Sequence, residues 1–163
     1  MKIQLLEKAH NRKDFTCEED SLTEYIRTQV SQDIRKRLAA CFVAVDNKQN
    51  VLGYYTLTSE SLGRELIPDK YLIQLPKNYN APVILLGRLA RDIRMKGTGL
   101  GEHLLLDALF RSYKLSNENI GAMAVVVDPI NEKAIEFYKG YGFEQLHDSG
   151  KMFLPMNIIG QLI

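Results

Sequence analysis

The sequence has little of what stabilises or anchors several classes of protein. It contains only two cysteines, Cys17 and Cys41, and three histidines among 163 residues. No Cys-x-x-Cys pair and no Cys/His spacing typical of zinc sites occurs, so we expect two reduced thiols, no disulfide framework and no metal. A chain of this length buries most of its apolar surface without such cross-links.

Long hydrophobic runs are also missing. No window approaches the roughly 20 apolar residues that a membrane helix needs, and the first ten residues lack the apolar segment of a secretory signal. The formal net charge is +1, so no overall field draws the protein onto nucleic acid or membrane, and a polyanion would have to bind a local patch. We therefore expect a single cytoplasmic domain over residues 1–163, without membrane contact.

The spacing of the apolar residues predicts an α/β layer fold. Strands are expected at 2–7, 41–45, 51–58, 83–90, 122–127 and 151–156, helices at 21–37, 100–115 and 131–139, and a loop with one helical turn at 62–80. The first helix would begin at a capping box of Ser21 and Glu24 and would have an apolar face that includes Ile34 and Leu38. The helix at 100–115 would face the core with Leu100, Leu104, Leu105, Ala108, Leu109 and Ser112. The strands at 83–90 and 122–127 are almost entirely apolar and are joined by a helix, which predicts a buried parallel pair with a crossover.

A glycine-rich loop separates the strand at 83–90 from the helix at 100–115. Its glycines permit positive φ and close approach of a ligand to the backbone. The free amides and the dipole at the start of the helix favour an anion, and Arg94 and Lys96 add positive charge. These features predict a phosphate or pyrophosphate site made by Arg94, Met95, Lys96, Gly97, Thr98, Gly99, Leu100 and Gly101. A loop that only turns the chain is the alternative.

Two common nucleotide-binding motifs do not fit this loop. A Walker A loop requires Gly-x-x-x-x-Gly-Lys-Ser/Thr, which is absent from the sequence. A Rossmann fingerprint requires Gly-x-Gly-x-x-Gly early in a βαβ unit, with an acidic residue about 20 positions further on. Here the spacing is Gly-x-Gly-x-Gly, and the loop lies past the middle of the chain. Both nucleotide hypotheses are therefore disfavoured.

Residues 82–145 resemble the core of the GNAT acetyltransferases. The motifs that carry the resemblance, in chain order, are Leu86-Gly87-Arg88-Leu89-Ala90, Arg94-x-x-Gly97-x-Gly99, Val126-Val127-Asp128, Asn131-x-x-Ala134, Phe137-Tyr138 and Gly142-Phe143. The resemblance implies an acetyl-CoA-dependent N-acetyltransferase of the GNAT fold. That fold has a mixed central sheet with a splayed parallel strand pair, flanked by helices.

The resemblance also implies a role for each matching residue. Amides from Arg94 to Gly99 would hold the CoA pyrophosphate, and the backbone of Leu89, Ala90 and Arg91 would pair with the pantetheine and polarise the thioester carbonyl. Asn131 would contact the pantetheine arm, Phe137 would pack beside it, and Tyr138 would protonate the departing thiolate. A phenol with a pKa near ~10 stays protonated at neutral pH, and a thiolate leaves more easily when a donor meets it. The alternative for Tyr138 is a core aromatic.

The N-terminal half narrows the resemblance. Phe15-Thr16-Cys17, Leu22-x-x-Tyr25-Ile26, Phe42-Val43-Ala44 and the segment 82–90 are similar to the toxin branch of type II toxin–antitoxin systems. That branch acetylates the α-amine of aminoacyl-tRNA and stops translation, which implies a charged tRNA as acceptor, a ribbon-helix-helix antitoxin as partner and a homodimer. Two positions depart from its pattern. Glu18 stands where a glycine often follows the cysteine, and Arg91 stands where an apolar residue is common.

The acceptor amine is constrained only weakly by the sequence. An α-amine with a pKa near ~7.7 is partly neutral in the cytoplasm, whereas a lysine amine needs a base or a desolvated site. Glu60, Glu65 and Asp92 are candidate bases, and nothing in the sequence selects one. For tRNA the candidate cationic contacts are Arg35, Lys36 and Arg88, although cations at a helix end also complement its dipole. A GNAT enzyme for a small amine, a protein N-terminus or a lysine, without RNA contact, is the alternative.

Overall fold

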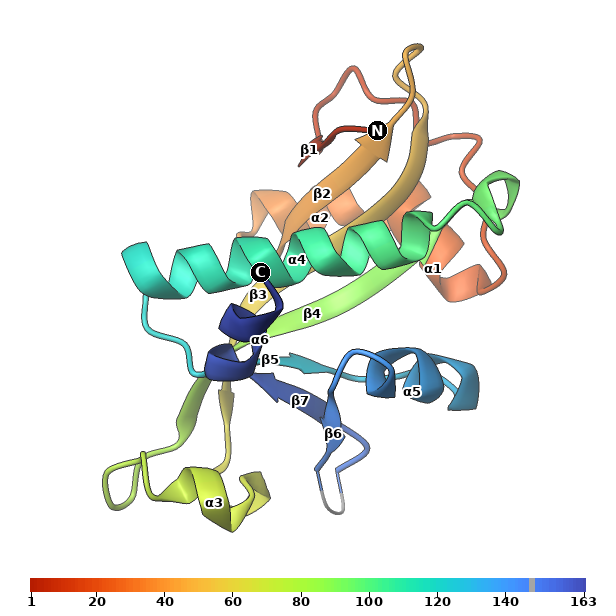
Figure 1. Ribbon diagram of the computed structural model, residues 1–163. Helices are drawn as coiled ribbons and strands as arrows, with labels where there is room; N and C mark the ends of the chain where they lie inside the picture. The colour runs from red at the N-terminus through yellow and green to blue at the C-terminus, as the bar shows by residue number, and fades with distance from the viewer. Residues whose placement is uncertain (147–148) are drawn as a thin grey trace. The chain divides into compact units, whose positions relative to one another are not determined.

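The computed structural model describes residues 1–146 and 149–163. Among these residues seven strands form one mixed sheet in the order β1-β2-β3-β4-β5-β7-β6 (Figure 1). β4 and β5 run parallel, whereas β1–β2, β2–β3, β5–β7 and β6–β7 are antiparallel. The predicted mixed sheet with one parallel pair and flanking helices is therefore confirmed.

The elements lie close to their predicted positions. The strands are β1 Ile3–Leu5, β2 Ala40–Val45, β3 Val51–Leu62, β4 Ala81–Arg91, β5 Ala124–Val127, β6 Glu144–Gln145 and β7 Met152–Pro155. The helices are α1 Asp20–Glu24, the π-helix η1 Tyr25–Gln29, α2 Val30–Arg35, the 3-10 helix η2 Arg64–Leu66, α3 Asp69–Leu72, the 3-10 helix η3 Ile93–Met95, α4 Leu100–Glu118, α5 Glu132–Lys139 and α6 Met156–Leu162.

The chain divides into two compact units. The first, which we call unit 1, comprises residues 1–58 and 87–108, and unit 2 comprises 59–86 and 109–163. The boundaries fall inside β3, β4 and α4 rather than in linkers, so each of these elements contributes to both units.

Unit 1 has helices on both faces of its strands. Tyr54 and Tyr55 are successive residues of β3 and therefore point to opposite faces. Tyr54 packs against Tyr25 of η1, with ring centroids 6.2 Å apart, and donates a hydrogen bond to the Leu22 carbonyl at 2.6 Å. On the other face Tyr55 donates to a carboxylate oxygen of Asp107 on α4 at 2.6 Å. The segment α1–η1–α2 thus covers one face and the first half of α4 covers the other.

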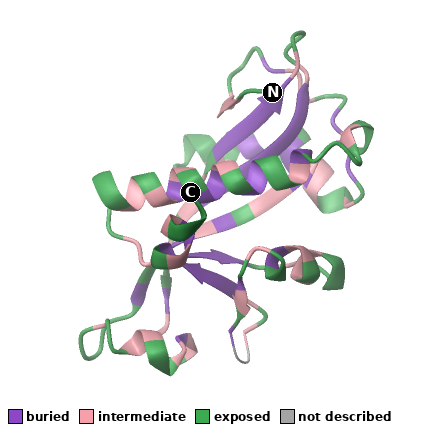
Figure 2. Cartoon of the chain, viewed as in Figure 1, coloured by how far each residue is buried: buried purple, intermediate pink, exposed green. Residues whose placement is uncertain are grey.

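Helix α4 follows the predicted amphipathic pattern, with buried and exposed residues that alternate along its length (Figure 2). The side chains predicted to face the core are all buried, namely Leu100, Leu104, Leu105, Ala108, Leu109 and Ser112. Gly53 of β3 allows the close approach of this helix, because a Cβ atom there would lie 2.8 Å from the Leu104 side chain.

Unit 2 also buries both faces of its strands. All four residues of β5 are buried, as the continuous apolar run predicted. On one face Leu62, Val83, Val126 and Phe153 belong to a buried cluster that is joined by side chains from residues 66–75. On the other face the turn after α5 packs on β7, where a Cβ atom at Gly142 would lie 3.5 Å from the Leu154 side chain.

Three details of the predicted secondary structure were wrong. The capping box does not form: Glu19 is the N-cap, no side chain caps the helix, and Ser21 lies inside the first turn. The π-helix η1 interrupts the predicted first helix, and such an insertion shifts the register of the following turn. Ile34 and Leu38, predicted on the buried face, are consequently exposed.

The two ends of the sheet region also differ from the prediction. β3 continues to Leu62, four residues beyond the predicted end at 58, and helix α6 was not predicted at all. Helix α6 approaches α4 closely, because a Cβ atom at Gly160 would lie 2.8 Å from the Tyr113 ring of α4.

Candidate active site

The glycine loop is anchored by the buried carboxylate of Asp92. The Arg94 guanidinium donates to both of its oxygens at 2.8 Å, the Arg94 amide donates at 2.9 Å and the Thr16 amide at 3.0 Å. Burial by itself would raise the pKa of Asp92, but the hydrogen bonds and charge of Arg94 outweigh it and lower that pKa. Asp92 is therefore a structural anchor and a poor proton acceptor, which removes one candidate base.

Some backbone amides of the loop donate hydrogen bonds within the protein and others do not. Those of Arg94, Met95, Lys96 and Thr98 donate within the segment 92–98. Among the described residues no acceptor lies within hydrogen-bonding distance of the amides of Gly97, Gly99 and Gly101. Any anion held by backbone amides would therefore use the glycines and the first turn of α4.

The glycines of the loop also leave room for a ligand. Gly97 and Gly99 have φ values of +79° and +83°, a conformation that favours glycine. A Cβ atom at Gly97, Gly99 or Gly101 would meet no atom within 4 Å. The space over the backbone is thus open, and the exposed Lys96 side chain adds a positive charge beside it.

Two contacts hold β4 just before the predicted pantetheine-binding residues. A Cβ atom at Gly87 would lie 3.1 Å from the Thr56 hydroxyl of β3, and the Arg88 guanidinium lies 3.6 Å from the centre of the Tyr25 ring. The Arg88 side chain is thus fixed on η1 by a cation–π contact.

Leu89, Ala90 and Arg91 are the last three residues of β4. The parallel pairing with β5 covers only Ile84, Leu85 and Leu86. The backbone of the three residues therefore lies beyond the last position at which β4 pairs with β5. A strand can pair with a ligand only where its backbone is not already paired with a neighbouring strand. The structure brings these residues together with the glycine loop within unit 1.

The two positions that depart from the toxin pattern contact one another. Arg91 Nη1 lies 3.4 Å from Glu18 Oε1, and the two side chains are 22% and 48% exposed. An ion pair with this exposure contributes less than about 1 kcal/mol. Its significance is geometric, because it links the segment after Cys17 to the end of β4.

The remaining predicted cofactor residues lie together on α5 in unit 2. Asn131 is the N-cap of this helix, and its side-chain oxygen accepts from the Ala134 amide at 2.9 Å. The Phe137 and Tyr138 rings are 5.3 Å apart, and Tyr138 also contacts Phe143 at 5.3 Å. The Asn131 amide group is thus held in a fixed orientation by its capping bond.

The Tyr138 side chain has the properties of a proton donor. It is only 8% exposed, and burial raises its pKa above the ordinary value, so the phenol stays protonated at neutral pH.

The candidate RNA-binding residues fall into two places in unit 1. Arg35 is the last residue of α2 and Lys36 follows it as the C-cap, and both are exposed. Arg88 covers the Tyr25 ring in a cation–π contact and is half-buried. The structure brings Arg35 and Lys36 together, whereas Arg88 is part of the packing around Tyr25.

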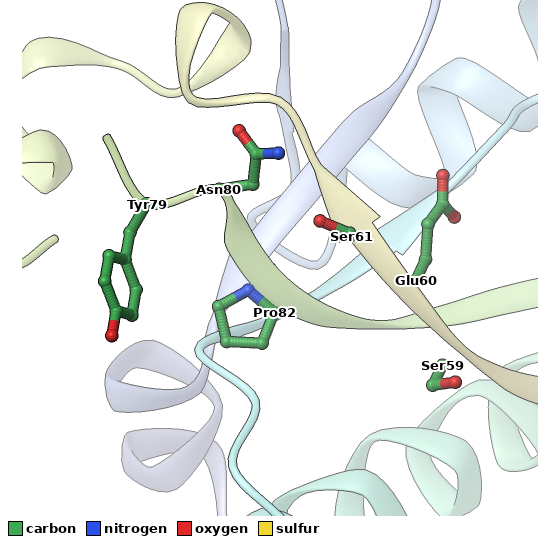
Figure 3. Close-up of a pocket in the computed structure, with 6 residues that line it drawn as sticks. All are labelled: Ser59, Glu60, Ser61, Tyr79, Asn80 and Pro82. Atoms are coloured by element: carbon green, nitrogen blue, oxygen red, sulfur yellow. The ribbon is translucent and has the colours of Figure 1, made fainter. Parts of the chain in front are cut away.

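A surface pocket of about 500 Å³ lies in unit 2, and the candidate base Glu60 is among the residues that line it. Its walls are Ser59, Glu60, Ser61, Tyr79, Asn80 and Pro82, at the end of β3 and the start of β4 (Figure 3). In the part of the chain that the structure describes, no group of three His, Cys, Asp or Glu side chains could hold a metal ion. Within the same residues no helix has the length and apolar character to cross a membrane.

Solved structures of similar chains define the class of protein. AtaT complexed with acetyl-methionyl-tRNAfMet is similar with a TM-score of 0.90 and 29% identity, over 99% of this chain and 98% of that one. A tyrosine-to-phenylalanine mutant of KacT gives 0.89 and 28% over 99% and 98%, and AtaTR bound with AcCoA gives 0.86 and 29% over 99% and 96%. The fold is that of the acetyl-CoA-dependent GNAT N-acetyltransferases.

Curated relatives define the family within that class. The tRNA-acetylating toxin of Mycobacterium tuberculosis (strain ATCC 25618 / H37Rv) is 35% identical over 130 residues, which cover 80% of this chain and 76% of the relative. A Sinorhizobium fredii (strain NBRC 101917 / NGR234) protein named "Probable toxin TacT" is 24% identical, over 94% of this chain and 90% of its own. No protein-family model matches the chain. The chain belongs to the family of tRNA-acetylating toxins.

Proposed function

We propose that this protein transfers the acetyl group of acetyl-CoA to the α-amine of aminoacyl-tRNA and thereby blocks translation. The observation that carries the proposal is the glycine loop, with three unpaired amides at the start of α4, in a chain of the toxin family. The AtaT complex with acetyl-methionyl-tRNAfMet and the AcCoA complex of AtaTR support both substrates.

The cofactor-binding residues act through two kinds of group. The amides of Gly97, Gly99 and Gly101 and the Lys96 side chain hold the pyrophosphate, while the Arg94 side chain keeps the loop in shape through Asp92. The backbone of Leu89, Ala90 and Arg91 pairs with the pantetheine, with further contacts from Asn131 and Phe137. Met95, Thr98 and Leu100 contribute to the same loop through its backbone.

Tyr138 donates a proton to the sulfur of CoA as the carbon–sulfur bond breaks. The acceptor nitrogen meanwhile bonds to the acetyl carbon and loses a proton to water, and the phenolate takes a proton back from water, so that the products are an amide and a neutral thiol. The buried phenol is protonated at neutral pH and is therefore available to donate as the thiolate forms.

The partners follow from the acceptor and from the relatives. We propose that Arg35, Lys36 and Arg88 contact the tRNA, that a ribbon-helix-helix antitoxin neutralises the toxin, and that the toxin acts in the cytoplasm as a homodimer. A structure of AtaT bound to the C-terminus of the antitoxin AtaR supports the antitoxin. Light scattering at a monomer mass would contradict the homodimer.

The two compact units form one folding domain in this proposal, because each boundary between them falls inside a strand or helix. Unfolding in urea should then give a single transition at which far-UV and near-UV circular dichroism coincide. Two separate transitions would show that the units unfold independently.

The test of the function is transfer of labelled acetyl from acetyl-CoA to a pool of aminoacylated tRNA, with deacylated tRNA as the matched control. Label should appear on charged tRNA alone and should be released by mild base together with the amino acid. Transfer to free amines or peptides, with no label on charged tRNA, would overturn the tRNA acceptor and leave the acetyltransferase.

A further inference from the structure

A charged cluster in unit 2 has not been assigned a role. Lys151 Nζ lies 2.9 Å from Asp128 Oδ1 and 3.3 Å from Glu60 Oε1. Asp128 directly follows β5, Lys151 directly precedes β7, and Glu60 lies in the last part of β3. We call Glu60, Asp128 and Lys151 the acidic triad, because two carboxylates and one ammonium leave it with a net charge of −1.

The acidic triad lies on one defined face of the strands. Leu62, Val126 and Phe153 belong to the same buried cluster. Glu60, Asp128 and Lys151 are each two residues away from one of these three. Because side chains alternate along a strand, the triad extends the face of that cluster.

Tyr138 belongs to the other face. The turn that ends α5 packs on Leu154, the neighbour of Phe153 along β7, and Tyr138 contacts Phe143 in that turn. Within unit 2 the proton donor and the triad are therefore on opposite faces of the same strands. The triad also lies where the parallel pairing ends, because Asp128 is the next residue after Val127, the last partner of β4.

One atom of the triad is left without a partner. Glu60 Oε2 is fully buried and accepts no hydrogen bond, although Oε1 faces Lys151. A buried carboxylate oxygen without a donor is costly, so the site suits a ligand that supplies one. Burial lowers the pKa of Lys151, but the hydrogen bond and charge of Asp128, with Glu60, outweigh that and raise it, so Lys151 stays charged at neutral pH.

The Lys151 contact with Glu60 is longer than its contact with Asp128, 3.3 Å against 2.9 Å. The side chains of Glu60 and Lys151 are 25% and 22% exposed, so the triad borders solvent.

We propose that Glu60 binds the amino group of the acceptor, with Oε2 accepting a hydrogen bond from the nitrogen and the net negative triad attracting its ammonium form. The inference rests on the proposed function and names the residue that recognises an unblocked primary amine. Lys151 and Asp128 are positioning residues that hold the Glu60 carboxylate. The acetylated product has a neutral amide nitrogen, so it loses this attraction and is released.

The test compares Glu60→Gln, which keeps the shape and removes the charge, with Glu118→Gln, a matched change at an exposed glutamate at the end of α4. In Glu60→Gln the KM for aminoacyl-tRNA should rise about tenfold or more, the size expected for a lost charge-assisted hydrogen bond. The affinity for acetyl-CoA and the melting temperature should stay at the values of Glu118→Gln. Asp128→Asn should give a smaller rise, because Oε2 is retained.

The pH dependence separates binding from a purely structural role. In the wild type the KM should rise above about pH 8, as the α-ammonium loses its charge, and in Glu60→Gln it should be flat. A KM that is unchanged in Glu60→Gln, or a pH profile that persists in it, overturns the inference.

A binding measurement keeps this inference distinct from the proposed function. Glycine methyl ester serves as a primary-ammonium probe, titrated by NMR into the wild-type protein saturated with CoA, and N-acetylglycine methyl ester is its blocked control. Binding of the free amine alone, lost in Glu60→Gln, supports Glu60 even if charged tRNA is not acetylated. Equal binding of both esters rejects the amine site even if charged tRNA is acetylated.

Discussion

We expect unit 1 and unit 2 to contribute to catalysis through different parts of the chain. The predicted site of unit 1 consists of backbone: unpaired glycine amides at the start of α4 and the strand end beyond the last position paired with β5. The predicted site of unit 2 consists of side chains: the Tyr138 phenol on α5 and the acidic triad. A cofactor common to a whole family can be held by backbone, whose donors do not depend on residue type, whereas proton transfer and acceptor choice need particular side chains.

The largest effect should come from removing one atom in unit 2. Tyr138→Phe should lower kcat for acetyl transfer by about 10²- to 10⁴-fold, the range expected for loss of a general acid. Its affinity for acetyl-CoA should be unchanged, because the ring still packs on Phe137 and Phe143. The measurements are steady-state kinetics and calorimetric titration with acetyl-CoA.

Tyr141→Phe is the matched control, since Tyr141 contacts the same Phe137 ring at 5.5 Å. Its kcat should stay within about twofold of the wild type. Equal turnover in both variants would move the acid to another group.

A substitution in unit 1 should act on binding instead of turnover. Gly97→Glu should weaken acetyl-CoA binding by about 100-fold or more. The glutamate carboxylate would repel the pyrophosphate, and a residue with a side chain is strained at the φ of +79° that Gly97 adopts. Gly97→Asn should lose much less, since asparagine tolerates this conformation and carries no charge. Calorimetry measures both, and unchanged affinity in Gly97→Glu would mean that the pyrophosphate binds elsewhere.

The anchor of the loop should affect stability more than chemistry. Asp92→Asn should lower the free energy of unfolding by about 2 kcal/mol, because it removes charge-assisted hydrogen bonds to Arg94. The pKa of Asp92 is lowered by folding, so its contribution is present above the unfolded value near ~3.9 and is lost as the pH falls through the folded value.

Urea unfolding at a series of pH values checks the sign of this effect. The stability difference between wild type and Asp92→Asn should be constant near neutrality and should shrink in acid. A difference that grows as the pH falls would contradict the assignment.

The smallest effect should come from Ser112 of α4 in unit 2. Its hydroxyl is fully buried and has no hydrogen-bond partner. Ser112→Ala removes an unsatisfied polar group and adds a better helix former, so the unfolding free energy should change by less than about 1 kcal/mol, toward greater stability. A loss of more than that in urea unfolding would show that the hydroxyl has a partner in solution.

The sequence predicted the elements whose periodicity comes from burial. β5 and α4 lie where their apolar patterns placed them, because each buries its apolar residues whatever the neighbours are. The end of β3 was missed since Ser59, Glu60 and Ser61 are polar, and Glu60 is accommodated there by Lys151, about 90 residues further on. Helix α6 was missed as well, because Gly160 disfavours a helix.

The candidate site shows the same division. The glycine loop and the Phe137-Tyr138 motif are local and were predicted from the sequence. The sequence could not distinguish Glu60, Glu65 and Asp92 as bases, because the four donors that surround Asp92 come from positions 16 and 94. Lys151 was not singled out at all, since its partners lie at positions 60 and 128.

The contact between Glu18 and Arg91 couples the two positions that depart from the toxin pattern. Replacing Glu18 with glycine or Arg91 with an apolar residue removes the same ion pair. The effects of the two substitutions should therefore not add. Anyone who alters the chain toward the toxin pattern should exchange both positions together, since the second substitution then has no ion pair left to remove.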